Sequence, residues 1–126
     1  MAPPVPRSRK AHAVPPVVDL AQARDARRVR ELQARCLAVD EVNRKSLARL
    51  FQSGLLYTRQ GARLGRDLLL AQQHLLRVGD LLARIAELPE GSTDGDAAAL
   101  YEEASALLAR TADLTARSGL VLARGS

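Results

Sequence analysis

The amino-acid sequence predicts an all-α protein, built as a coiled-coil-like hairpin or a three-helix bundle. Ala and Leu, which enter helices at little cost, supply 22 residues each of the 126. Two Tyr, one Phe and no Trp leave little material for a thick globular core. No proline occurs between Pro16 and Pro89. These observations favour long helices joined along a thin aliphatic seam.

The clearest helical pattern is a core seam of apolar residues that repeats in steps of four and three. Such heptad spacing keeps one apolar side of a helix turned toward a partner helix. The core seam comprises Leu64, Leu68, Ala71, Leu75, Val78, Leu82 and Ile85. We therefore expect a helix that ends near Leu88, just before Pro89.

The first 18 residues have the composition of a disordered arm that is rich in proline and arginine. Residues 1–18 contain five prolines, three basic residues and no acidic residue, so they have little apolar surface to bury. We expect the first helix to begin near Asp19, whose carboxylate can cap the positive helix end. The sequence thus predicts three parts: the arm 1–18, a helical domain 19–118 and a short tail 119–126.

The apolar pattern continues upstream of the core seam as an N-terminal stripe. Its members are Val29, Leu32, Cys36, Val39, Asn43, Leu47, Leu50, Gly54 and Tyr57. One arrangement is a single helix, straight or kinked, from Asp19 to Leu88; the in-phase passage through the glycines and the absence of a strong N-cap favour it. The other is a break between Gly54 and Gly65, in which Gly54 ends the first helix as a C′ glycine.

A loop and a further helix follow the core seam. Residues 89–96 combine Pro, Gly, Ser, Thr and Asp, which indicates a loop. Asp96 is the expected N-cap of a helix that ends at Ser118–Gly119. Its seam contains Leu100, Ala104, Leu107, Thr111 and Leu114. Because the loop is short, we expect an antiparallel hairpin, with the tail 119–126 against its end or against a partner.

No arrangement of residues in the sequence indicates catalysis. Cys36, the only cysteine, lies on the N-terminal stripe, which favours a buried apolar role. His74 has no metal ligand at the next helical turns, and phosphate-loop, nucleophile-elbow and zinc motifs are missing. We expect a non-enzyme without cofactor, metal or small-molecule substrate. The lone cysteine suits the cytoplasm, and 17 Arg against 2 Lys hint at a bacterial origin.

The N-terminal stripe is the predicted interface with a partner. If the first helix is continuous, the C-terminal helix covers only the core seam and the stripe stays exposed, which is unusual for a soluble monomer. The stripe would then bind a second copy or a different helical protein, as in an adaptor, scaffold or chaperone-like protein. Asn43 resembles the polar seam residues that fix register in coiled coils. A turn near Gly54 would instead fold the stripe inward and give a compact three-helix bundle.

The alternative function is non-specific binding of nucleic acid or of an anionic membrane surface. Between Asn43 and Arg66 the chain carries six basic residues and no acidic residue. These candidate anion-binding residues are Arg44, Lys45, Arg49, Arg59, Arg63 and Arg66. Such a rod could lie along phosphates, although the sequence contains no helix-turn-helix, zinc finger or aromatic stacking platform.

Overall fold

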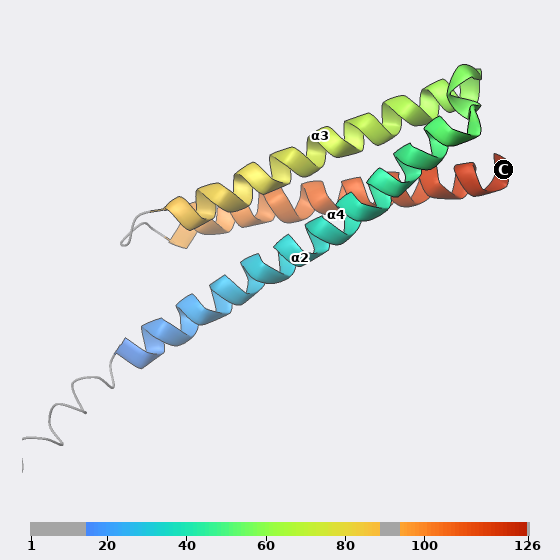
Figure 1. The fold of residues 1–126 in the computed structure, drawn as a ribbon. Coiled ribbons are helices and arrows are strands. Elements are labelled where there is room, and N and C mark those ends of the chain that lie inside the picture. Colours follow the sequence, from blue (N-terminus) through green and yellow to red (C-terminus); the bar gives the residue numbers. More distant parts are fainter. Residues whose placement is uncertain (1–14, 89–93, 126) are drawn as a thin grey trace, which may run out of the picture. The chain divides into compact units, whose positions relative to one another are not determined.

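The computed structural model of the protein describes residues 15–88 and 94–125. This part of the chain consists of α2 (Pro15–Ser53), the short 3-10 helix η1 (Leu55–Tyr57), α3 (Arg59–Glu87) and α4 (Asp94–Gly125), and it contains no strand (Figure 1). The all-α prediction is confirmed.

The first helix begins earlier than the sequence indicated. α2 starts at Pro15 instead of near Asp19, because proline is tolerated in the first helical turn, where its missing N–H has no partner to lose. The predicted arm 1–18 is therefore wrong for its last four residues, and its first 14 lie outside the described residues. Packing divides the chain into two units, residues 1–31 and 32–126; the described part of the first is the beginning of α2.

The chain breaks between α2 and α3 at Gly54. This residue has φ 76° and ψ −2°, a left-handed conformation that only glycine adopts without strain. Thr58 then caps α3: its hydroxyl accepts a hydrogen bond from the Gly61 N–H at 2.9 Å and donates one to the Leu55 carbonyl at 2.6 Å. The continuous helix from Asp19 to Leu88, which the sequence favoured, is wrong, and the break within Gly54–Gly65 is confirmed.

Small residues allow the turn to pack closely on the first turns of α3. A Cβ on Gly61 would overlap the carbonyl oxygen of Leu55, and a Cβ on Gly65 would lie 3.3 Å from Cδ1 of Leu56. The glycines in this region therefore serve a contact within the chain, between η1 and α3.

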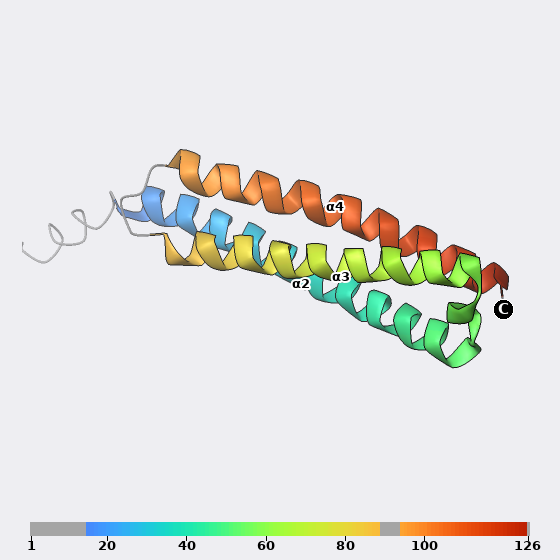
Figure 2. The same cartoon turned by 90° about the horizontal axis from the view of Figure 1, so that it is seen from above.

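α3 and α4 form the predicted antiparallel hairpin, side by side along their lengths (Figure 2). The core seam is buried as far as Leu82, and Ile85 is half-buried. On α4 the fully buried residues are Ala104, Leu108, Thr111, Thr115, Ser118 and Leu122. The predicted seam members Leu100, Leu107 and Leu114 are only half-buried. The buried side of α4 also contacts α2, because the Thr115 hydroxyl donates to Oδ1 of Asn43.

The last helix is longer at both ends than the sequence indicated. It begins at Asp94 instead of Asp96 and continues through Ser118–Gly119 to Gly125. The continuation is favourable because Leu122 is buried in an apolar cluster with Leu50, Leu64 and Leu68. Residues 119–125 are thus helical, and Leu122 belongs to the core.

Candidate interaction surface

The C-terminal half of α2 is joined to both other helices through Asn43. Its amide nitrogen donates to the Leu68 carbonyl and to Oε1 of Gln72, each at 3.0 Å, and its Oδ1 accepts from the Thr115 hydroxyl at 3.1 Å. Gln72 in turn donates to Oδ1 of Asp40 at 2.8 Å. Residues 32–53 of α2 therefore complete a three-helix bundle with α3 and α4.

This arrangement corrects the prediction that the N-terminal stripe is an exposed interface. Leu32, Asn43 and Leu50 are fully buried. The half-buried members are Val29, Cys36, Val39 and Leu47. Because the turn at Gly54 folds residues 32–53 of α2 back on the hairpin, the apolar side of this segment is used inside the chain. Gly54 and Tyr57 lie in the exposed turn, with Tyr57 91% exposed, and do not extend the stripe.

The exposed leucines of the structure include Leu70 and Leu120. Three more that the sequence pattern did not single out are Leu37, Leu69 and Leu76, which are 70%, 55% and 66% exposed. Each follows directly after a residue that joins α2 to α3. The Cys36 thiol lies 3.9 Å from the Leu75 carbonyl, and Asn43 bonds to the Leu68 carbonyl.

One step along a helix rotates a side chain by about 100°. Since α2 and α3 are antiparallel, that rotation carries Leu37, Leu69 and Leu76 to the same outer face of the bundle. We call these three residues the leucine surface. A sequence signal existed: they are leucines outside the seam positions, on an otherwise polar side of each helix.

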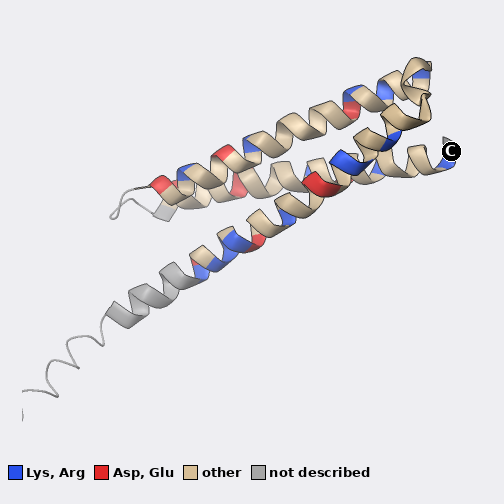
Figure 3. Ribbon diagram, viewed as in Figure 1, with Lys and Arg blue, Asp and Glu red and all other residues tan. Residues whose placement is uncertain are grey.

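The six predicted anion-binding residues are all exposed but do not converge on one face. Arg44 and Lys45 form ion pairs with Asp40 and Glu41 one helical turn earlier, at 2.9 and 3.3 Å, and Arg49 lies further along the same helix. The other three belong to α3 and share one of its sides: Arg59, Arg63 and Arg66. Figure 3 shows basic and acidic residues on each of α2, α3 and α4.

Cys36 has the properties of a structural cysteine. It is half-buried, and burial, followed by the nearby Asp40 carboxylate, raises the pKa of its thiol above the ordinary value. A raised pKa lowers the thiolate fraction at neutral pH, so the environment works against nucleophilic chemistry.

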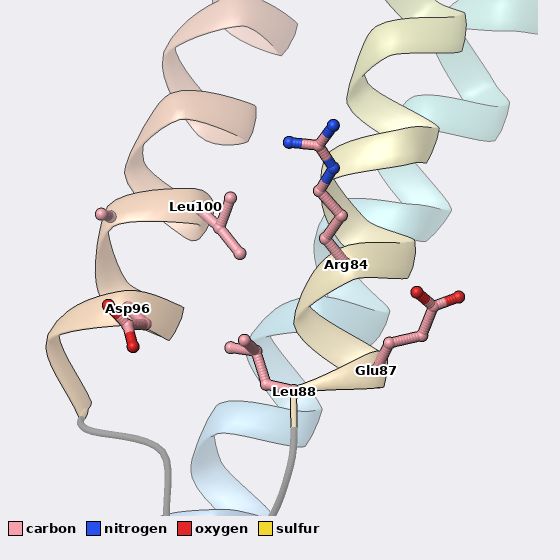
Figure 4. Close-up of a pocket in the computed structure, with 6 residues that line it drawn as sticks. Arg84, Glu87, Leu88, Asp96 and Leu100 are labelled. Atoms are coloured by element: carbon pink, nitrogen blue, oxygen red, sulfur yellow. The ribbon is translucent and has the colours of Figure 1, made fainter.

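A shallow hollow lies where α3 and α4 approach the connecting loop (Figure 4). Leu88 and Leu100 line it with Ala99, and the charged side chains at its edge are Arg84, Glu87 and Asp96. The Glu87 carboxylate points away from Asp96 in this view, so the two do not form an acid–base pair. Within the described residues, no three His, Cys, Asp or Glu side chains are placed to hold a metal ion.

Among the helices of residues 15–88 and 94–125, no segment is both long enough and apolar enough to span a bilayer. The arrangement offers exposed leucines and arginines on a rigid helical bundle. No family model matches the chain, and neither a curated protein nor a solved structure matches it.

Proposed function

We propose that the protein is a small helical interaction module, an adaptor or scaffold, that binds a helical protein through the leucine surface. The observation that carries the proposal is the exposure of Leu37, Leu69 and Leu76 on one face of a bundle whose seam residues are already buried. Covering a leucine contributes up to about 2 kcal/mol. Three on one face offer a helical partner substantial binding free energy.

The rigidity of the underlying bundle supports this role. Leu69 and Leu76 directly follow the buried residues Leu68 and Leu75 in α3, and Leu37 directly follows Cys36 in α2. The Asp40–Gln72 hydrogen bond fixes the two helices relative to each other at this level. A surface held in this way loses little conformational entropy when a partner binds.

The test is retention of proteins from a native cell extract on the immobilised full chain. We expect a partner to be retained by the wild type and lost by the variant Leu37→Gln/Leu69→Gln/Leu76→Gln. The matched control is Leu120→Gln, which changes an exposed leucine of α4. Retention that is unchanged in the triple variant contradicts the proposal, provided that circular dichroism gives the same helix content for all three proteins.

A second candidate is binding of anionic polymers or surfaces by Arg59, Arg63 and Arg66, which share one exposed side of α3. Binding to DNA, RNA or acidic vesicles should weaken steeply as salt is raised, and Arg59→Gln/Arg63→Gln should reduce the salt dependence. The same substitutions at the ion-paired Arg44 and Lys45 serve as the control. Absence of binding at low salt eliminates this candidate.

A further inference from the structure

The outer side of α3 carries a second heptad pattern, separate from the core seam. Nine positions between Arg59 and Glu87 are spaced alternately by three and four, and all nine are exposed. We call this set the outer stripe: Arg59, Ala62, Arg66, Leu69, Gln73, Leu76, Asp80, Ala83 and Glu87. It spans nearly the whole helix, about 40 Å at about 1.5 Å per residue. Heptad spacing of this kind is the pattern by which one helix packs along another.

The apolar members of the outer stripe have the same order in both directions along the helix. They are Ala62, Leu69, Leu76 and Ala83, seven residues apart. When two such helices lie antiparallel about the middle of the stripe, Leu69 of one copy lies level with Leu76 of the other, and Ala62 with Ala83, to within about one residue, or about 1.5 Å. The apolar part of the stripe is therefore complementary to itself.

The polar members are complementary to themselves in charge. They are Arg59, Arg66, Gln73, Asp80 and Glu87, again seven residues apart. When a second copy runs in the opposite direction, with its Gln73 at the same level, Arg66 of one copy lies opposite Asp80 of the other and Arg59 lies opposite Glu87. A parallel pair would place arginine against arginine and acid against acid, which is unfavourable. The charges thus select an antiparallel arrangement.

We propose that two copies of this chain associate through their outer stripes, antiparallel, with a two-fold axis at Gln73. The inference rests on the proposed function, because Leu69 and Leu76 belong to the leucine surface, and it names a second copy of the chain as the partner. A two-fold interface requires a surface that is complementary to itself, and the outer stripe has this property in both its apolar and its charged members.

A hollow on α3 lies where the arrangement requires one. It is lined by Arg63, Arg66, Asp67, Leu69, Leu70 and Gln73. Four of these residues, at positions 66, 69, 70 and 73, have the spacing of a coiled-coil hole that accepts a side chain of the facing helix. In an antiparallel pair about Gln73, Leu76 of the second copy lies level with Leu70 of the first. Leu76 of each copy therefore lies at the level of this hollow on the other copy, once on each side of the two-fold axis.

Neither Arg66 nor Asp80 forms an ion pair in the described part of the chain, so both charges are available to a second copy. Arg77, the basic neighbour one turn before Asp80, pairs instead with Glu103 of α4 at 3.2 Å. The few apolar side chains in the stripe indicate a modest interface, with a dissociation constant on the order of micromolar.

The first experiment measures the mass of the full chain by sedimentation at concentrations up to about 1 mM, beyond the micromolar range expected for dissociation. We expect a monomer–dimer equilibrium in the wild type, and at least tenfold weaker association in Leu76→Gln. Leu120→Gln, which changes the exposed leucine on α4, should associate like the wild type. A wild-type chain that remains monomeric over the whole range overturns the inference, as does a dimer that Leu76→Gln does not weaken.

The second experiment tests the antiparallel register by charge reversal. Arg66→Asp places two carboxylates opposite each other, because the new side chain faces Asp80 of the second copy. Asp80→Arg places two guanidinium groups opposite each other in the same way, so each variant alone should associate about tenfold more weakly at low salt. Mixing the two variants restores opposite charges at both contacts and should recover dimers. No effect within one chain can produce recovery on mixing, and a mixture that stays monomeric overturns the proposed register.

The outcomes separate this inference from the proposed function. If the chain stays monomeric but the triple leucine variant loses a protein that the wild type retains from the extract, the proposed dimer is wrong. The proposal that the protein is an interaction module is then still supported. If the mixed charge variants dimerise, both proposals are supported. If the chain stays monomeric and the leucine variant retains the same proteins as the wild type, both are wrong.

Discussion

Asn43 is fully buried, and its side chain makes hydrogen bonds to both other helices of the bundle. A buried amide is favourable only when its donors and acceptor have partners. Here Leu68, Gln72 and Thr115 supply them, so the three helices fit together in only one axial register. The interpretation of Asn43 as a register residue thus acquires a structural basis, within one chain and not between chains.

We expect Asn43→Ala to lower the free energy of unfolding by about 2–4 kcal/mol, because it removes these hydrogen bonds and leaves a cavity. Urea denaturation followed by circular dichroism measures the change. Gln33→Ala removes an exposed amide from the same helix and should change stability by no more than about 0.5 kcal/mol. Equal effects of the two substitutions would contradict the assigned role of Asn43.

Cys36 provides a prediction that depends on pH. Since burial and the Asp40 carboxylate raise the pKa of its thiol, the folded protein holds less thiolate than the unfolded chain at the same pH. Any stability that the neutral thiol contributes is present below the unfolded pKa and is lost as pH rises through the folded pKa.

Alkylation of Cys36 by iodoacetamide should therefore be slower at pH about 8 in the folded protein than in urea, and the rate should rise at a higher pH. Asp40→Asn removes the negative charge that contributes to the raised pKa of Cys36, and it leaves an oxygen to accept the hydrogen bond from Gln72. The pH at which the alkylation rate rises should therefore be lower in this variant. A rate profile that is identical in folded and unfolded protein would contradict the raised pKa.

The turn between α2 and α3 is the element that decides the fold. The heptad pattern predicted each helix and the α3–α4 hairpin, because the spacing of apolar residues depends only on the helix itself. It could not decide between a continuous helix and a break. The stripe remains in phase across Gly54, whereas the cap at Thr58 depends on contacts with Leu55 and Gly61.

The same limit applies to the end of α4 and to the candidate surface. The sequence predicts a helix end at Gly119, because glycine often occupies the position just after the last helical residue. In the structure, burial of Leu122 against Leu50 and Leu64 keeps the chain helical past this point. Once residues 32–53 of α2 fold back, their stripe becomes core, whereas Leu37 and Leu76, which lie outside the seam positions, stay exposed.

Gly61 tests the turn directly. Because a Cβ there would overlap the Leu55 carbonyl oxygen, we expect Gly61→Ala to destabilise the protein by about 2–3 kcal/mol. Gly79→Ala is the matched control: a Cβ on Gly79 would meet nothing within 4 Å, so the substitution should stabilise the exposed helix by about 0.5–1 kcal/mol. Thermal unfolding followed by circular dichroism distinguishes the two, and shifts of the same sign would contradict the close packing of η1 on α3.

At the scale of the whole bundle, contacts between distant parts of the sequence hold the second unit together. The cluster of Leu50, Leu64, Leu68 and Leu122 joins the residues on both sides of the turn to the end of the chain. Asn43 and Thr115, 72 residues apart, are hydrogen-bonded near the middle of the same bundle. The end of α4 therefore supports the turn, and residues 32–126 should unfold as one cooperative unit.

Leu122→Ala measures this coupling over distance. Truncating a fully buried leucine should cost about 2–4 kcal/mol, and the loss should increase amide hydrogen exchange in residues 47–68 as well as in the last turns of α4. Leu120→Ala, which truncates an exposed leucine two residues away, should leave exchange in both segments unchanged. Exchange by mass spectrometry resolves the segments. Faster exchange confined to residues 115–125 would mean that the end of α4 frays independently, and the cooperative unit would then not include this end.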